Sequence, residues 1–157
     1  MKLSENALTW VMRLYPPFLF QRIWIRKFHK GYQAVDVRVR RSFLNRNSNG
    51  SIFGGTIFSA TDPLYALLFG QLMRRRGFRT IVWLKSAQIR YLKPAMTSLT
   101  ITVRISDEQV REVEQTLINN GKFVKVFSVE LLDRTGEVCA VADNEVYIRN
   151  LDWSAEN

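Results

Sequence analysis

The N-terminal third of the chain changes from helical to strand spacing of its apolar residues. Between Ser4 and Pro16 these residues recur three or four apart, which predicts a short amphipathic helix. The apolar and basic segment 18–28 is predicted as a second helix. Over residues 35–40, valines alternate strictly with charged residues, which indicates a half-buried strand.

Residues 52–73 form a long apolar stretch whose only charge is Asp62. The stretch opens at Gly54 and closes with three arginines and Gly77, a pattern typical of a helix with cations in its last turn. An Asp-Pro pair at its centre is too costly in lipid, so a buried helix is predicted instead of a membrane span. If the helix begins at Gly54, Pro63 should kink it; if it begins at Asp62, Asp62 is its N-cap.

The rest of the chain is predicted to form strands. They are expected over 80–91, 99–105, 122–132 and 137–149, and the polar segment 107–115 is either a short helical connection or the rise into a strand. One antiparallel sheet wrapped around one helix buries a helix that is apolar on nearly all sides.

The fold class predicted from this pattern is α+β. A long central helix is wrapped by an antiparallel sheet of about five strands, with extra N-terminal helices. Residues 1–30 are expected to be an N-terminal helical extension and residues 31–150 the main domain, within a single domain overall.

Composition narrows the chemistry. At 157 residues and 46% hydrophobic content, the chain has the size and composition of one globular domain. The single cysteine, Cys139, excludes an intramolecular disulfide, and its apolar neighbours predict a small core residue in a cytoplasmic protein. The single histidine, His29, lies among cations, so neither a His/Cys metal site nor a histidine base is expected.

The net charge of +9 is concentrated near the N-terminus. Residues 1–50 hold ten Lys or Arg against two Asp or Glu, whereas residues 51–157 hold 13 against 12. Such a segment attracts phosphate-bearing partners: nucleic acid, an anionic membrane or coenzyme A. Residues 18–30, basic and aromatic, could make a peripheral membrane contact, and nucleic acid is the less expected partner.

Two features carry candidate chemistry. Gly54-Gly55 at a helix start leaves backbone N–H groups free to face a ligand. Asp62, if it points into the protein, should have a raised pKa and suit a general base or nucleophile. The alternatives are purely structural roles: a tight turn at the glycines, a helix cap at Asp62 and a polar loop over 45–50.

The pattern Asn47-x-x-Gly50-x-x-Phe53-Gly54-Gly55-x6-Asp62 resembles the Asn-x-x-Gly-x-x-His-Gly-Gly-x6-Asp signature of hotdog thioesterases of the phenylacetate-pathway type. Residues 88–95 resemble that family's strand ending in aromatic-x-x-Pro-Ala, and the likeness spans about residues 32–149. Pro16-Pro17-Phe18, Asn45-Arg46-Asn47 and Asp62-Pro63 look closer still to an uncharacterised bacterial branch with Phe-Gly-Gly in place of His-Gly-Gly.

This resemblance implies a hotdog fold and hydrolysis of an acyl-CoA thioester. Asp62 would attack the thioester or activate water, Gly54 or Gly55 N–H would polarise the carbonyl, and Asn47 would orient the substrate or the water. The coenzyme A moiety, which enters as part of the substrate, would lie against Tyr91, Leu92, Lys93, Pro94, Ala95, Asn120, Gly121 and Lys122. No metal and no separate cofactor are expected.

The same resemblance implies a homodimer or a dimer of dimers. Gly55 and Asp62 are seven residues apart, which is about 10 Å along a helix. Oxyanion donors and the attacking group must both lie about 3 Å from one carbonyl, so the two should come from antiparallel helices of neighbouring chains.

Two departures from the family leave alternatives open. The motif histidine is replaced by Phe53, and a family serine after the helix falls at Leu84. A non-catalytic acyl-CoA or lipid-binding module is therefore the second hypothesis. A peripheral membrane or nucleic-acid protein is the third.

Overall fold

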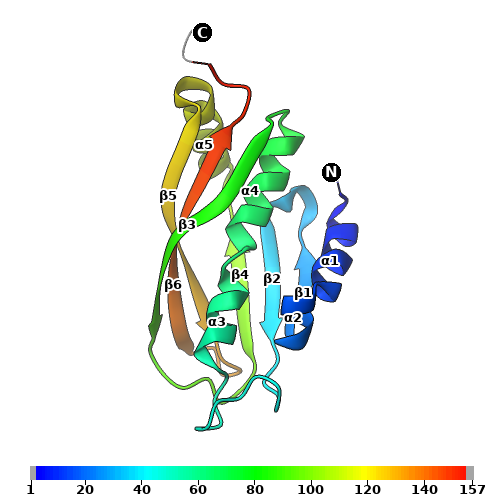
Figure 1. The fold of residues 1–157 in the computed structure, drawn as a ribbon, viewed down its shortest axis with the longest axis vertical. Helices are drawn as coiled ribbons and strands as arrows, with labels where there is room; N and C mark the ends of the chain where they lie inside the picture. The colour runs from blue at the N-terminus through cyan, green and yellow to red at the C-terminus, as the bar shows by residue number, and fades with distance from the viewer. Residues whose placement is uncertain (1–2, 155–157) are drawn as a thin grey trace.

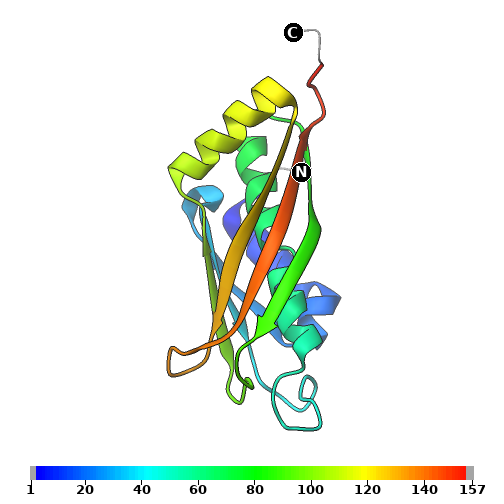
Figure 2. The same ribbon diagram turned by 90° about the vertical axis from the view of Figure 1, so that its left-hand side faces the viewer.

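One antiparallel sheet curls around a central pair of helices in the computed structural model, which describes residues 3–154 (Figures 1 and 2). The sheet has six strands in the order β1-β2-β4-β5-β6-β3. These are β1 (Ile23–Phe28), β2 (Ala34–Val39), β3 (Thr80–Tyr91), β4 (Leu99–Arg104), β5 (Lys122–Leu132) and β6 (Val138–Asn150). All neighbouring strands are antiparallel, so β1 and β3 are the two edges.

The helices are α1 (Glu5–Leu14), α2 (Pro16–Phe20), the 3₁₀ turn η1 (Lys30–Tyr32), α3 (Gly54–Thr61), α4 (Leu64–Arg75) and α5 (Asp107–Asn120). Local chemistry sets their ends. Ser4 accepts a hydrogen bond from the Ala7 N–H at 3.2 Å, and a capping box at Ser106 opens α5. Gly121 ends α5 in the left-handed conformation.

The predicted central helix begins at Gly54 and breaks at Pro63, so the predicted kink is confirmed. Proline lacks the N–H that would continue the ladder, and α4 starts one residue later. Asp62 keeps helical dihedral angles at the end of α3, and α4 has no side-chain cap. Asp62 is therefore not the N-cap that the alternative interpretation required.

The core lies between this broken helix and the sheet. Leu68 and Phe69 of α4 are fully buried, and the Phe127 ring of β5 lies 5.3 Å from Phe69 and 4.8 Å from Tyr65. Each such side chain contributes about 1.5–3 kcal/mol relative to leaving it exposed. Cys139 is buried, as the sequence predicts.

The helix predicted over residues 18–28 is wrong beyond Phe20. Residues 23–28 are β1, which pairs with β2, so the sheet has six strands where about five were expected. A bulge between Ile25 and Lys27 turns Phe28 inward, and this broken alternation hides the period of two that marks a strand. The division drawn at residue 30 thus falls between two paired strands, and residues 1–30 are not wholly helical.

Of the two alternatives for 107–115, the helical one is correct, as α5. Residues 3–154 contain no helix long and apolar enough to span a membrane.

Candidate active site

The segment from Asn47 to Ser51 is a loop folded around one side chain. Asn47 Oδ1 accepts from the N–H groups of Asn49 and Ser51 at 3.0 and 3.1 Å, and its Nδ2 donates to Ser51 Oγ at 2.8 Å. Arg41, which the sequence analysis missed, braces the same loop through two bonds to the Gly50 carbonyl at 2.8 and 2.6 Å. Asn47 still has one amide hydrogen without an acceptor among residues 3–154.

Helix α3 begins directly behind this loop, and its first two N–H groups have no acceptor in the described part of the chain. A side chain at either position would meet a neighbouring aromatic ring. A Cβ on Gly54 would lie 3.0 Å from the Tyr91 hydroxyl, and one on Gly55 would lie 2.4 Å from the Phe53 ring. The free N–H groups at the positive end of a helix favour a developing negative charge.

The segment after β3 completes the wall opposite α3. Leu92 and Lys93 N–H groups donate to the Cys139 carbonyl at 2.8 and 3.2 Å, and the Ile52 N–H donates to the Ala95 carbonyl at 3.0 Å. These bonds place the two loops against each other.

Between these walls lies a cavity of about 350 Å³. It is lined by Asn47, Ser51, Ile52, Gly54, Ile57 and the run Tyr91–Ala95. The structure thus brings together seven residues named from the sequence: Asn47, Gly54, Tyr91, Leu92, Lys93, Pro94 and Ala95.

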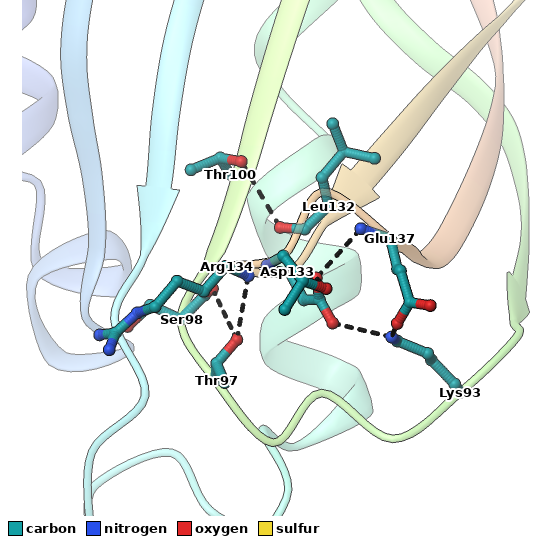
Figure 3. A network of polar contacts seen from close by, with 9 residues as sticks. Lys93, Thr97, Ser98, Thr100, Leu132, Asp133, Arg134 and Glu137 are labelled. Atoms are coloured by element: carbon teal, nitrogen blue, oxygen red, sulfur yellow. Dashed lines mark hydrogen bonds and ion pairs between the residues drawn. The ribbon is translucent and has the colours of Figure 1, made fainter.

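Lys93 is less available for a phosphate than its position suggests. Its ammonium group lies 2.8 Å from Asp133 Oδ2 and also bonds Glu137, both in the turn between β5 and β6 (Figure 3). The hydrogen bonds that its ammonium group donates to Asp133 and Glu137 raise the pKa of Lys93. With two carboxylates on one ammonium group, little positive charge is left for a ligand.

Asp62 lies outside the cavity lining, at the far end of α3 from the glycines. Its carboxylate is exposed in the single chain, yet the surrounding protein desolvates it enough to raise its pKa. The helix from Gly55 to Thr61 is unbroken, so Asp62 remains about 10 Å along the axis from the Gly55 N–H.

A buried side chain of β6 contacts the break between α3 and α4. Asn144 of β6 is fully buried, and its Nδ2 donates to the Thr61 carbonyl at 3.2 Å. Its Oδ1 is the buried side-chain atom without a partner among the described residues. The signal in the sequence was a lone amide at an inward position of β6, between Ala142 and Val146.

Asn120, Gly121 and Lys122 lie where α5 meets β5, at the end of the molecule opposite α3 (Figure 1). They line a different hollow, beside Trp153. A single chain does not bring them to the cavity at Gly54. Within residues 3–154, no three His, Cys, Asp or Glu side chains gather as a metal site would require.

A central helix wrapped by one antiparallel sheet, with a loop and two glycines at the helix start, defines the hotdog fold. The chain belongs to the family described as domain of unknown function DUF4442, whose model matches residues 4–148.

Solved structures share this fold. PA5026 of Pseudomonas aeruginosa, described as a protein of unknown function and probable thioesterase, has a TM-score of 0.76 at 21% identity over 96% of this chain and 98% of its own. The thioesterase HI1161 of Haemophilus influenzae has a TM-score of 0.70 at 11% identity, over 99% and 97%. A mutant thioesterase PA1618 of Pseudomonas aeruginosa has a TM-score of 0.69 at 11% identity, over 96% and 97%. No curated protein matches the chain.

Proposed function

We propose that this protein is a thioesterase that hydrolyses an acyl-CoA thioester to the free acid and coenzyme A. The observation that carries the proposal is the start of α3, where the N–H groups of Gly54 and Gly55 have no acceptor among residues 3–154 and Gly54 lines the cavity. They are suited to an oxyanion, and thioester hydrolysis passes through one. Structural neighbours that are called thioesterases support the same reaction.

Asp62 supplies the second group. As general base it takes a proton from water while the water oxygen bonds to the carbonyl carbon; the C–S bond then breaks and the thiolate receives a proton. As nucleophile its carboxylate oxygen bonds to the carbonyl carbon, the C–S bond breaks and the coenzyme A thiolate leaves. Water then opens the acyl anhydride, which releases the acid and restores the Asp62 carboxylate, and the proton from the water passes to the thiolate. Burial raises its pKa, which makes the carboxylate a stronger base than an ordinary aspartate.

The site requires a second chain, so the proposal includes a homodimer or a dimer of dimers. At the β1 edge, Arg13 of α1 donates to the carbonyls of Ile25 and Arg26, both at 2.8 Å, and so covers the edge. The 12-residue edge strand β3 has no such cover among the described residues. Long bare edges favour pairing with another strand, and antiparallel β3 strands would bring one chain's Asp62 toward the other chain's Gly55.

The test is release of thiol from a panel of coenzyme A thioesters by the purified full-length protein. Asp62→Asn should lower turnover by about 100-fold or more. Asp107→Asn, at the start of the distant helix α5, is the matched control and should leave it intact. Turnover by Asp62→Asn equal to that of the control refutes the assignment.

A non-catalytic acyl-CoA-binding module is the second candidate, favoured by Phe53. This side chain stands where relatives of the resembled type have histidine, it is 57% exposed, and its ring covers Gly55. Saturable binding of acyl-CoA by calorimetry, with no thiol release from any member of the panel, would establish this alternative.

A further inference from the structure

The outer side of α1 carries a second apolar face. Leu8 and Met12 are buried, whereas Trp10, Val11 and Leu14 are 56%, 51% and 65% exposed. The spacing places these three residues together on the side of the helix away from the sheet. Helix α1 stands at the β1 side of the molecule (Figure 1), so this face points outward.

A second group of exposed apolar side chains lies at the corner below α1. Phe20 is 70% exposed and Phe43 is 77% exposed. The buried side chain of Asn45 holds the two loops together, because its Nδ2 donates to the carbonyls of Gln21 and Arg40, both at 2.9 Å. The two loops at this corner are therefore fixed relative to each other, and both phenyl rings are exposed to solvent.

Alternating aromatic and arginine side chains connect these two groups. The guanidinium of Arg13 lies 4.8 Å from the Trp10 ring centroid and 4.7 Å from that of Trp24, and the guanidinium of Arg40 lies 5.9 Å from Trp24. Cation–π contacts fix these cations and rings on one surface.

The charge on this side is not neutralised. The two acids of residues 1–50 are already paired, Glu5 with Arg75 and Asp36 with His29. Four cations of this surface have no carboxylate partner in residues 3–154: Arg13, Arg22, Arg26 and Arg40. Arg13 donates to the Arg26 carbonyl at 2.8 Å, and the Arg40 N–H donates to the Arg22 carbonyl at 3.0 Å, so the four lie together.

We propose that this basic aromatic face, made by Trp10, Val11, Leu14, Phe20, Phe43 and the cations above, docks on an anionic phospholipid membrane. Trp and Arg are favoured at the level of lipid headgroups, and exposed apolar side chains add burial in the acyl boundary. The proposal does not depend on thioester hydrolysis.

The chemistry favours a membrane over two other partners. A second copy meeting this face across a twofold axis would bring like charges together. Nucleic acid offers phosphates to the cations but no apolar layer for Val11 and Leu14. The membrane contact expected over residues 18–30 is revised, because Phe18, Ile23 and Phe28 are buried in the core.

The docking face lies next to the candidate cavity. The Phe53 N–H donates to the Asn45 carbonyl at 2.8 Å, so the corner residue Asn45 adjoins the start of α3. A docked membrane would therefore lie beside the glycine loop.

The experiment is sedimentation of the full chain with vesicles of phosphatidylcholine alone and of phosphatidylcholine mixed with phosphatidylglycerol. Binding to the mixed vesicles only, weakened by salt, is expected. Arg22→Asn, which tolerates the positive φ of Arg22, should reduce partition roughly fivefold, as for one cation at a charged surface. The double change Phe20→Glu with Phe43→Glu should abolish binding.

The matched control is Ile118→Glu, because Ile118 of α5 is 61% exposed on another part of the molecule. It should bind vesicles as the parent does. In a second measurement, tryptophan emission should shift to the blue with mixed vesicles, and Trp10→Phe should diminish the shift.

Four results would overturn the proposal: no binding to mixed vesicles, equal loss in the Ile118 control, salt-sensitive retention on nucleic acid with no vesicle binding, or a double variant that binds vesicles normally but loses self-association.

Discussion

The hydroxyl of Tyr91 donates a hydrogen bond to the carbonyl oxygen of Gly54 at 2.9 Å and so joins the last residue of β3 to the first residue of α3. The cavity wall and the proposed oxyanion donor are thus one unit. Burial raises the pKa of Tyr91, which keeps the phenol protonated as a donor.

This contact predicts coupling between the two residues. A Cβ at Gly54 would meet the Tyr91 hydroxyl at 3.0 Å, tighter than ordinary contact. Gly54→Ala should therefore lower kcat/KM more in the parent than in a Tyr91→Phe background, with a coupling of about 1 kcal/mol. A double-mutant cycle measures this coupling.

The control is a second cycle with Tyr147→Phe, because Tyr147 is stacked against Trp83 and does not contact Gly54. The two changes of the control cycle should be additive. Additivity in both cycles would contradict a role for the Tyr91–Gly54 contact.

Asp62→Asn should lower kcat by about 10²–10⁴-fold, the usual range for a lost general base, without loss of stability. The raised pKa means that ionised Asp62 is less favourable in the folded chain than in the unfolded one. The stability linked to protonated Asp62 is fully present below the pKa of Asp62 in the unfolded chain. It is lost as pH rises through the pKa of Asp62 in the folded chain. The Tm of Asp62→Asn should therefore equal or exceed that of the parent at neutral pH.

The parent's kcat should rise with pH over the range in which Asp62 ionises, above the ordinary aspartate range. A rate independent of pH through that range would exclude Asp62 as the base.

The ion pairs of Lys93 predict that replacing Lys93 and replacing Lys122 affect the KM for acyl-CoA differently. Lys93→Ala should leave KM for acyl-CoA nearly unchanged, because Asp133 and Glu137 already balance its charge. Lys122 has no carboxylate partner in residues 3–154, and Lys122→Ala should raise KM while kcat changes little. Steady-state kinetics decide it; a rise in KM for Lys93→Ala alone would reverse the assignment.

Lys93 should instead contribute to stability at neutral pH. The hydrogen bond from Lys93, with that from Thr135, holds the pKa of Asp133 below its usual range. A depressed carboxyl pKa stabilises the fold above the unfolded pKa, and the effect is lost as pH falls through the folded pKa. The Tm difference between Lys93→Ala and the parent should therefore shrink in strong acid. A constant difference would show that the pair carries no linked stability.

A shared site predicts complementation between two inactive chains. One chain carries Asp62→Asn and the other Gly55→Val, whose side chain would displace the Phe53 ring over the glycine. After subunit exchange, half of the sites in a heterodimer have both groups intact, and thiol release should return. No recovery despite proven exchange, or full activity in a monomer, argues for a site within one chain.

The sequence predicted the elements that depend on local chemistry. The central helix was predicted to begin at the glycines 54 and 55, to break at Pro63 and to end at the arginines before Gly77. The structure confirms all three positions. Strict alternation in residues 35–40 likewise marked β2. Strand β1 was missed because a bulge between Ile25 and Lys27 breaks the alternation that marks a strand in a sequence.

The candidate site shows the same division. Residue types and spacing alone determined that Asn47, Gly54, Gly55 and Asp62 were the groups to examine, because the chemistry needs those groups near a helix start. Only the tertiary structure decided that Lys93 pairs with Asp133, 40 residues away along the chain. It also decided that Asn144 contacts the helix break. The structure alone placed Asn120–Lys122 in a different hollow, at the opposite end of the molecule. Contacts between distant segments depend on how strands pair across the sheet, and no local period in a single sequence records that pairing.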